Sequence, residues 1–166
     1  MKTNTRSIAA AAVIGALYAV LTIALAPISY GAVQFRVSEA LCVLPYFLPS
    51  SAWGLFIGCA AANLITGNIF DIIFGSLATL LAALCTAYFG RKTPGSLNRL
   101  AACLMPVIFN AVIVGIELGL LFFPGNAVTG SLICGLEVGA GELISVILGW
   151  FLIKALKRTE IFDKEE

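Results

Sequence analysis

The sequence predicts an all-α polytopic membrane protein, a single domain (residues 1–166) of six transmembrane helices. The chain is 60% hydrophobic and only 11% charged, and its mean hydropathy of +1.02 is not that of a soluble domain of this length. Its apolar runs reach the roughly 18 residues that a bilayer-crossing helix needs. Short alternating strands are missing from the pattern, which therefore does not support a β-barrel.

Apolar runs and the breakers between them define the spans. The first run outlasts the apolar core of about 7–15 residues found in signal peptides, so we expect it to be retained. Glycine, proline, serine and asparagine cluster between runs, as in "APISYG", "LPSS" and "RKTPGS". Because a bilayer satisfies no backbone hydrogen bonds, the lipid-exposed runs should be helical. The expected spans are approximately 8–26, 36–48, 52–66, 71–89, 100–123 and 131–155.

The second span is short because it stops at Pro49. About 13 residues rising 1.5 Å each give roughly 20 Å, against a hydrocarbon core of about 30 Å. A re-entrant second segment would leave five crossings and move the C-terminus to the other side of the membrane.

Basic residues favour six crossings. With the N-terminus inside, the loops assigned outside hold no lysine or arginine, and Arg36 at the mouth of span two is the nearest. This distribution satisfies the positive-inside rule. We therefore expect a multi-pass protein of the cell membrane, surrounded by lipid, with both termini cytoplasmic. The inner side would hold Lys2, Arg6, Arg91, Lys92, Arg99, Lys154, Lys157, Arg158 and Lys164.

The sequence lacks most of the residues and motifs that catalysis and metal binding require. The chain has no histidine, and its five cysteines form no C-x-x-C pattern, so neither a disulfide framework nor a zinc site is indicated. No nucleotide-binding P-loop or hydrolase motif is present. A net charge of +1 without a basic patch argues against a nucleic-acid partner. We therefore expect that the protein has no catalytic residue and no metal site, and that it is not an enzyme.

Acidic side chains gather in the outer half of the expected bundle. A charge inside a membrane helix costs roughly 2.5–3.5 kcal/mol on insertion scales, so it normally faces the bundle interior, a partner or water. The acids outnumber the nearby arginine, which indicates a water-accessible cavity that opens outward and suits a cationic or donor-rich ligand. Helix-packing hydrogen bonds are the alternative. The residues concerned are Glu39, Asp71, Glu117, Glu137 and Glu142, with Arg36.

Polar neighbours extend this predicted site. Asn110 and Glu117 are seven positions apart on one helical face, and Asn63 lies near the outer end of span three. Arg36 and Glu39 can neutralise each other at the rim of the short span. Their role would be to hold the preceding loop over the cavity, or to touch the ligand directly.

A stripe of small residues marks the first span. Ala12 and Ala16 are four positions apart in "AAVIGALYA", a spacing that lets another helix approach closely. Internal packing and the docking of a partner subunit both remain open on this pattern.

The stretches "YGAVQFRVSEALCVLPYF", "FDIIFGSLATLLAA", "VIFNAVIVGIEL" and "VGAGELISVILG" together resemble the QueT family of queuosine-precursor transporters. The likeness runs from Ser7 to Leu156, and it departs at the termini and in the loop "RKTPGSLN". It implies a substrate-binding S component of an energy-coupling factor (ECF) transporter, with an ECF S-component-like bundle. Such a protein binds no cofactor itself. A transmembrane coupling subunit and two ATPase subunits, which use ATP, would energise it, and Ala12 and Ala16 would be its docking face.

The implied ligand is a 7-deazaguanine compound, queuine or a pre-queuosine base. Its guanine-like edge offers an N–H and an NH₂ side by side, which one carboxylate accepts as a bidentate pair. Glu117 or Glu142 would take this edge, Asn110 the carbonyl or pyrrole side, and Glu39 or Asp71 an amine. Tyr30 and Phe35 would stack on the base. The alternatives are an S component for another small vitamin, a stand-alone proton-coupled transporter and, less supported, an intramembrane enzyme.

Overall fold

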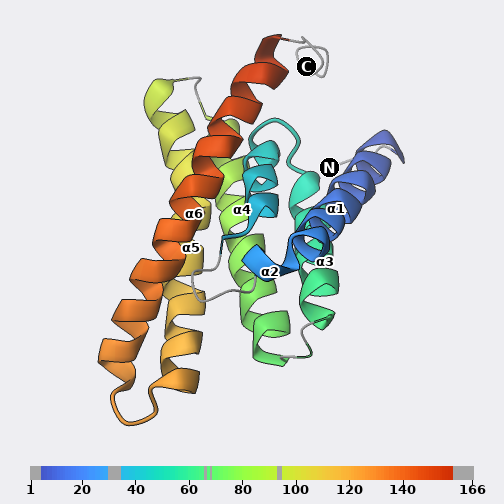
Figure 1. Cartoon of the computed structure of the whole chain (residues 1–166). Coiled ribbons are helices and arrows are strands. Elements are labelled where there is room, and N and C mark those ends of the chain that lie inside the picture. The colour runs from blue at the N-terminus through green and yellow to red at the C-terminus, as the bar shows by residue number, and fades with distance from the viewer. Residues whose placement is uncertain (1–4, 30–34, 66, 68, 93–94, 159–166) are drawn as a thin grey trace.

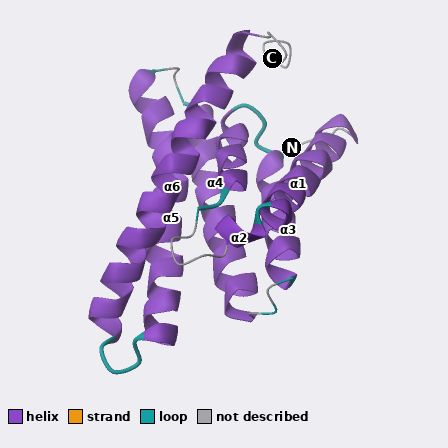
Figure 2. Ribbon diagram, in the orientation of Figure 1, coloured by secondary structure: helices purple, strands orange, loops and turns teal. Residues whose placement is uncertain are grey.

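The computed structural model describes residues 5–29, 35–65, 67, 69–92 and 95–158. Helices joined by short connections make up this part of the chain, and no strand occurs in it (Figure 2). This confirms the all-α prediction. The elements are α1 (Thr5–Ala24), α2 (Ala26–Ser29), η1 (Val37–Tyr46), α3 (Ser51–Leu64), η2 (Asp71–Gly75), α4 (Ser76–Gly90), α5 (Ser96–Phe122) and α6 (Ala127–Arg158).

The helices run back and forth along one axis (Figure 1). Four segments are long and apolar enough to cross a membrane, and two shorter apolar helices, Val37–Tyr46 and Ser51–Leu64, accompany them. The start of α1, the α4–α5 connection and the end of α6 lie at one end of the molecule, and the α5–α6 loop lies at the other. The chain is therefore a multi-pass membrane bundle in which the start of α1 and the end of α6 lie at the same end.

The second span is as short as the sequence predicts, and it has an unexpected geometry. η1 is a ten-residue 3₁₀-helix that contains Pro45, although runs of this tighter helix longer than 3–4 residues are uncommon. A 3₁₀-helix rises about 2.0 Å per residue instead of 1.5 Å, so a short sequence covers more depth. Residues Ser38 to Pro45 are all buried, which places η1 inside the bundle between the other helices.

Helices α1 and α3 touch backbone to backbone. A Cβ added to Gly54 would lie 1.9 Å from the carbonyl oxygen of Ala11, and one added to Gly58 would lie 2.3 Å from that of Gly15. Only glycine allows such an approach, and small residues are what membrane helices use to pack closely. The internal packing of α1 thus depends on Ala11 and Gly15.

Pro106 sits inside α5 and has no N–H to offer the carbonyl of Ala102, four residues earlier. Thr86 of α4 donates a hydrogen bond of 3.0 Å to that oxygen. Lipid offers no hydrogen-bond donor, so this contact between two helices supplies the one that the Ala102 carbonyl oxygen lacks. The contact also ties α4 to α5 close to where α4 ends and α5 begins.

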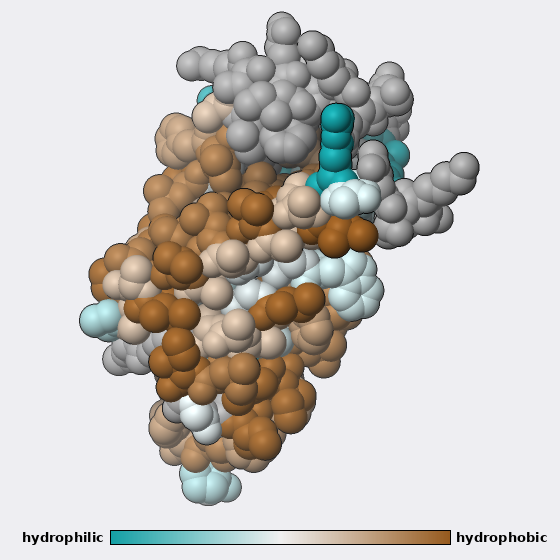
Figure 3. Space-filling view, turned by 90° about the vertical axis from the view of Figure 1, so that its right-hand side faces the viewer, coloured by the Kyte–Doolittle hydropathy of each residue, from teal (hydrophilic) through white to brown (hydrophobic). Residues whose placement is uncertain are grey.

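The outer faces of the bundle are apolar. Large side chains such as Val13, Ile57, Leu132 and Phe151 are more than half exposed, as expected where lipid replaces water. Figure 3 shows this hydrophobic surface on the face turned toward the viewer, with the strongly hydrophilic atoms gathered toward the end that carries the termini. The polar groups that remain within the spans are mostly inside.

Candidate functional site

Glu39 of η1 is held by donors from three elements. Tyr18 of α1 donates its hydroxyl hydrogen to Oε1 of Glu39. Thr79 of α4 lies 3.3 Å from the same oxygen, and the thiol of Cys42 donates to Oε2 at 2.9 Å. All four side chains are completely buried. Glu39 is therefore an anchored carboxylate, with most of its acceptor capacity used by the protein.

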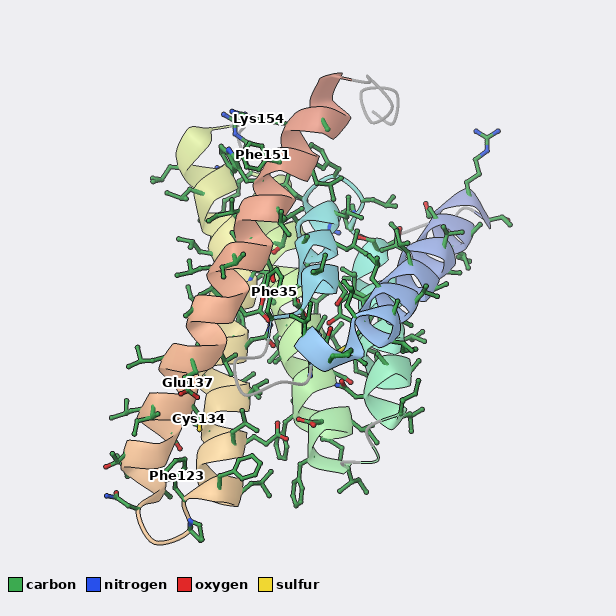
Figure 4. The ribbon with its side chains drawn as sticks, viewed as in Figure 1. Phe35, Phe123, Cys134, Glu137, Phe151 and Lys154 are labelled. Carbon is green, nitrogen blue, oxygen red and sulfur yellow. The ribbon has the colours of Figure 1, made fainter. Side chains whose placement is uncertain are left out.

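Arg36 caps η1 from inside the bundle. Its side chain is 5% exposed, and Nη1 lies 3.9 Å from the sulfur of Cys59 in α3. Ser145 of α6 donates a 2.8 Å hydrogen bond to the Arg36 carbonyl oxygen, which fixes the start of η1 against α6. Figure 4 places the preceding residue, Phe35, near mid-height of the molecule. Arg36 is thus deeper than the rim position expected, because η1 starts partway through the bundle.

Asp71 and Asn63 meet where span four begins. The side-chain amide of Asn63 donates a 2.8 Å hydrogen bond to the Asp71 carbonyl oxygen. Asp71 opens η2, a π-helical turn, a geometry that occurs frequently at functional sites. Both residues are buried, so the wider turn brings an acid into the bundle rather than to its surface.

Helices α5 and α6 contribute the remaining acids. Asn110 donates a 3.1 Å hydrogen bond from Nδ2 to Oε1 of Glu142, while Oε2 of Glu142 has no donor among the described residues. No described N–H, hydroxyl or thiol group donates to either oxygen of Glu117. Its neighbour is another acid, Asp71, which can share a hydrogen bond with it only when one of the two carboxyl groups carries a proton. Three buried carboxylate oxygens are therefore open to a donor from outside the protein.

These side chains form one electrostatic unit, the buried acidic cluster, which comprises Arg36, Glu39, Asp71, Glu117 and Glu142. The charge of Arg36 acts on Glu117 and on Glu142, and Glu39 acts on Glu142. One guanidinium thus acts on two acids, Glu117 and Glu142, in a cluster that holds four carboxyl groups. The excess of acceptors suits a ligand rich in N–H donors. Within the described ranges, no group of side chains is arranged to hold a metal ion.

The cluster is covered rather than open. Sequence reasoning expected a water-accessible cavity, but Asp71 is 8%, Glu117 5% and Glu142 3% exposed. Helices η1, α4, α5 and α6 surround these side chains and leave them little contact with solvent. The structure therefore corresponds to a closed arrangement of the cluster.

Three predicted site residues are not assigned to the acidic cluster: Glu137 lies away from it, Phe35 directly precedes Arg36, and Tyr30 is not among the described residues. Glu137 is exposed on α6, and Figure 4 shows it closer to the α5–α6 loop than Phe35 is. It is five residues, about 140° of helical rotation, from the buried Glu142, so it points away from the cluster. Phe35 is half-buried.

Sequence reasoning missed the donors that hold the cluster. Tyr18, Thr79, Cys42 and Ser145 all contact it, and none of them is charged. Tyr18 carries the one available signal, a hydroxyl in the middle of an apolar span, because buried tyrosines usually find a hydrogen-bond partner.

Ala12 and Ala16 face outward. Both line an apolar groove of about 410 Å³ between α1 and α3, together with Ile57, Gly58 and Ala61. Internal packing is served by the neighbouring Ala11 and Gly15 instead. Ala11 and Gly15 also line the groove, so the small-residue stripe serves internal packing along its buried edge and leaves Ala12 and Ala16 exposed beside it.

A second apolar groove, of about 600 Å³, runs along α5 and α6 and is lined by residues such as Ile116, Leu120, Leu132 and Leu136. Its walls are side chains of the lipid-facing surface. Neither this groove nor the α1–α3 groove includes the acidic cluster.

Comparison with known proteins finds similarity to one transporter family along nearly the whole chain. Residues 8–158 match the family described as QueT transporter. A curated relative, the queuosine precursor transporter QueT of Lactococcus lactis subsp. cremoris (strain MG1363), is 32% identical over 169 residues, which cover 96% of this chain and 98% of the relative. No solved structure matches the chain.

Proposed function

Because the chain belongs to the QueT transporter family, a family of transporters and not of enzymes, we propose that it captures a queuosine precursor at the buried acidic cluster for uptake into the cell. The carrying observation is the set of three buried carboxylate oxygens, on Glu117 and Glu142, without a described donor. A buried acceptor left unpaired costs about 1–3 kcal/mol, and more when it is charged. A ligand that donates to these oxygens recovers this cost, which favours binding.

The chemistry of a 7-deazaguanine base fits this arrangement. Its guanine-like edge presents two neighbouring N–H donors, which suit a carboxylate. Glu142 is oriented by Asn110, and this leaves Oε2 for the ligand. Glu117 offers both oxygens, and Asp71 adds negative charge beside it. Asn110 thus acts as a positioning residue, and the guanine-like edge is assigned to Glu117 and Glu142.

The energy for uptake comes from other subunits in this proposal. The chain acts as the S component of an ECF transporter, binds no cofactor itself, and docks through Ala12 and Ala16 onto a transmembrane coupling subunit carried by two ATPase subunits that use ATP. The exposed groove between α1 and α3 supports this role, since both alanines line it. The start of α1 and the end of α6 then lie on the cytoplasmic side, in line with the basic Lys154 at that end of the molecule (Figure 4).

Equilibrium binding to the purified protein tests the ligand assignment. Queuine and a pre-queuosine base are titrated against wild type, Glu142→Gln and Glu117→Gln, with guanine, thiamin and riboflavin as competitors. We expect binding of the 7-deazaguanines and a loss of at least tenfold in affinity in both variants. Preference for a vitamin, or unchanged affinity in both variants, would overturn the assignment.

Uptake in cells tests the energy source. Uptake of queuine should stop when ATP is depleted and should survive an uncoupler as long as ATP is maintained. Uptake that collapses with the uncoupler while ATP is present would instead identify a proton-coupled transporter.

A further inference from the structure

Tyr18 reaches the acidic cluster from the helix that carries the exposed docking groove. Its side chain is completely buried, and its hydroxyl donates to Oε1 of Glu39. Glu39 in turn belongs to η1, the same helix that Arg36 caps. The contact joins α1 to the centre of the cluster, although α1 contributes no charged side chain to it.

The other donor to that oxygen is shared. The hydroxyl of Thr79 lies 3.3 Å from Oε1 of Glu39, 3.4 Å from the sulfur of Cys59 and 3.1 Å from the Gly75 carbonyl oxygen. A threonine hydroxyl has one hydrogen, so it serves one of these acceptors at a time. Tyr18 is thus the dedicated hydroxyl donor to Oε1 among the described residues.

The position of Glu39 affects the groups that we assign to the ligand. Glu39 and Arg36 both act electrostatically on Glu142, whose Oε2 is open. Without the Tyr18 hydroxyl, Oε1 of Glu39 keeps, among the described donors, only the Thr79 hydroxyl, which also has other acceptors. The carboxylate is then freer to turn toward the guanidinium of Arg36, three residues earlier in the sequence. Rotation of Glu39 toward Arg36 would withdraw that positive charge from Glu142 and Glu117.

We propose that Tyr18 is a positioning residue of the ligand site: through its hydrogen bond to Glu39 it holds Arg36 and the open oxygen of Glu142 in the arrangement that binds the ligand. The inference rests on the proposed function, because it takes the acidic cluster as the ligand site. Tyr18 itself does not touch the ligand in this scheme.

The test is a double-mutant cycle in the full-length purified protein, with queuine as the probe. Wild type, Tyr18→Phe, Glu39→Met, which removes the oxygen that accepts from Tyr18, and the double variant are compared by equilibrium binding. We expect Tyr18→Phe to weaken binding about tenfold, since hydrogen bonds to charged groups are among the stronger ones. Because Tyr18 acts only through Glu39, the same substitution should change affinity less than threefold in the Glu39→Met background, where the acceptor of its hydroxyl is gone.

Thr22→Val is the matched control. Thr22 also links α1 to η1, by a 2.6 Å hydrogen bond to Ser38, but it touches none of the acids. Its loss should leave queuine affinity within threefold of wild type, and thermal unfolding without ligand shows whether each variant is folded. An equal loss in Thr22→Val would mean that only general α1–η1 packing matters, which overturns the inference.

Three further outcomes separate the proposals. If wild type binds queuine and Tyr18→Phe binds it equally well, the role of Tyr18 is wrong and the ligand assignment stands. If Tyr18→Phe does not fold, Glu39→Met decides alone: wild-type affinity in that variant excludes any action of Tyr18 through Glu39. Failure of wild type to bind any 7-deazaguanine would overturn the proposed function, and this inference with it.

Discussion

The side-chain amide of Asn110 donates a 3.1 Å hydrogen bond to Oε1 of Glu142, which joins α5 to α6 at the centre of the bundle and leaves Oε2 without a described donor. The hydrogen bond thus orients the carboxylate of Glu142, but one of its two oxygens still has no described donor. This half-paired state distinguishes Glu142 from Glu39, whose two oxygens both have protein donors.

Two glutamates on α6 provide the sharpest comparison. Glu142→Ala should reduce queuine affinity by tenfold or more, because it removes a buried acceptor of the ligand. Glu137→Ala should bind like wild type, since Glu137 is exposed and points away from the cluster. Calorimetric titration of both purified variants measures this. Loss of binding in Glu137→Ala would return that residue to the site, as the sequence alone predicted.

Replacing Glu117 by an apolar residue should raise the stability of the protein and abolish ligand binding. A methionine of similar length removes two buried, unpaired oxygens, and replacing buried charges by apolar side chains is often neutral or stabilising. We expect Glu117→Met to unfold a few degrees higher, from about 1 kcal/mol of added stability, and to lose queuine binding. Glu39→Met should be destabilised, because it strands the donors Tyr18 and Cys42. Thermal unfolding in detergent compares the two; a lower unfolding temperature for Glu117→Met would contradict the unpaired state.

Bulk in the α1–α3 groove should block uptake without affecting binding. Ala12→Leu and Ala16→Leu fill a surface that both residues line, and the proposed coupling subunit then docks poorly. We expect uptake in cells to fall about tenfold or more, the equivalent of roughly 1.4 kcal/mol of docking energy, while queuine affinity stays within threefold. Ala140→Leu, on an exposed face of α6 outside both grooves, is the control. Normal uptake in both groove variants would reject the docking face.

The α1–α3 contact should tolerate no added methyl group. In Gly54→Ala the new Cβ would lie 1.9 Å from the Ala11 carbonyl oxygen, whereas nothing lies within 4 Å of a Cβ on Gly125. Overpacking of this kind typically costs about 1–3 kcal/mol. Gly54→Ala should therefore unfold at a clearly lower temperature than wild type, and Gly125→Ala should not. Equal unfolding temperatures would show that α1 and α3 are not in backbone contact.

Thr86 and Pro106 should be coupled energetically. Thr86→Val strands the Ala102 carbonyl oxygen, which has lost its helical donor to Pro106, at a cost of about 1–3 kcal/mol. In a Pro106→Ala background the restored N–H satisfies that oxygen, so the same substitution should cost less. A double-mutant cycle of unfolding free energies measures the difference. Additive effects would mean that the hydroxyl does not serve this oxygen.

Much of the fold was predictable, since the length and composition of the apolar runs define helices in a bilayer. The expected span at 36–48 is the buried helix Val37–Tyr46, and the expected span at 71–89 is η2 followed by α4. The 3₁₀ geometry of η1 and the π turn at Asp71 were not predicted, because helix type depends on how neighbours pack and pair with the backbone.

The sequence by itself determined that acids lie inside an apolar bundle, because charge in a membrane helix is too costly to be placed without a partner or a ligand. Only the tertiary structure decided which acids are paired. Glu39 receives donors from α1 and α4, sequence-distant helices, whereas Glu117 receives none from the described chain. Hydrogen bonds require atoms within about 3 Å, and residues far apart in sequence come that close only after the helices have packed.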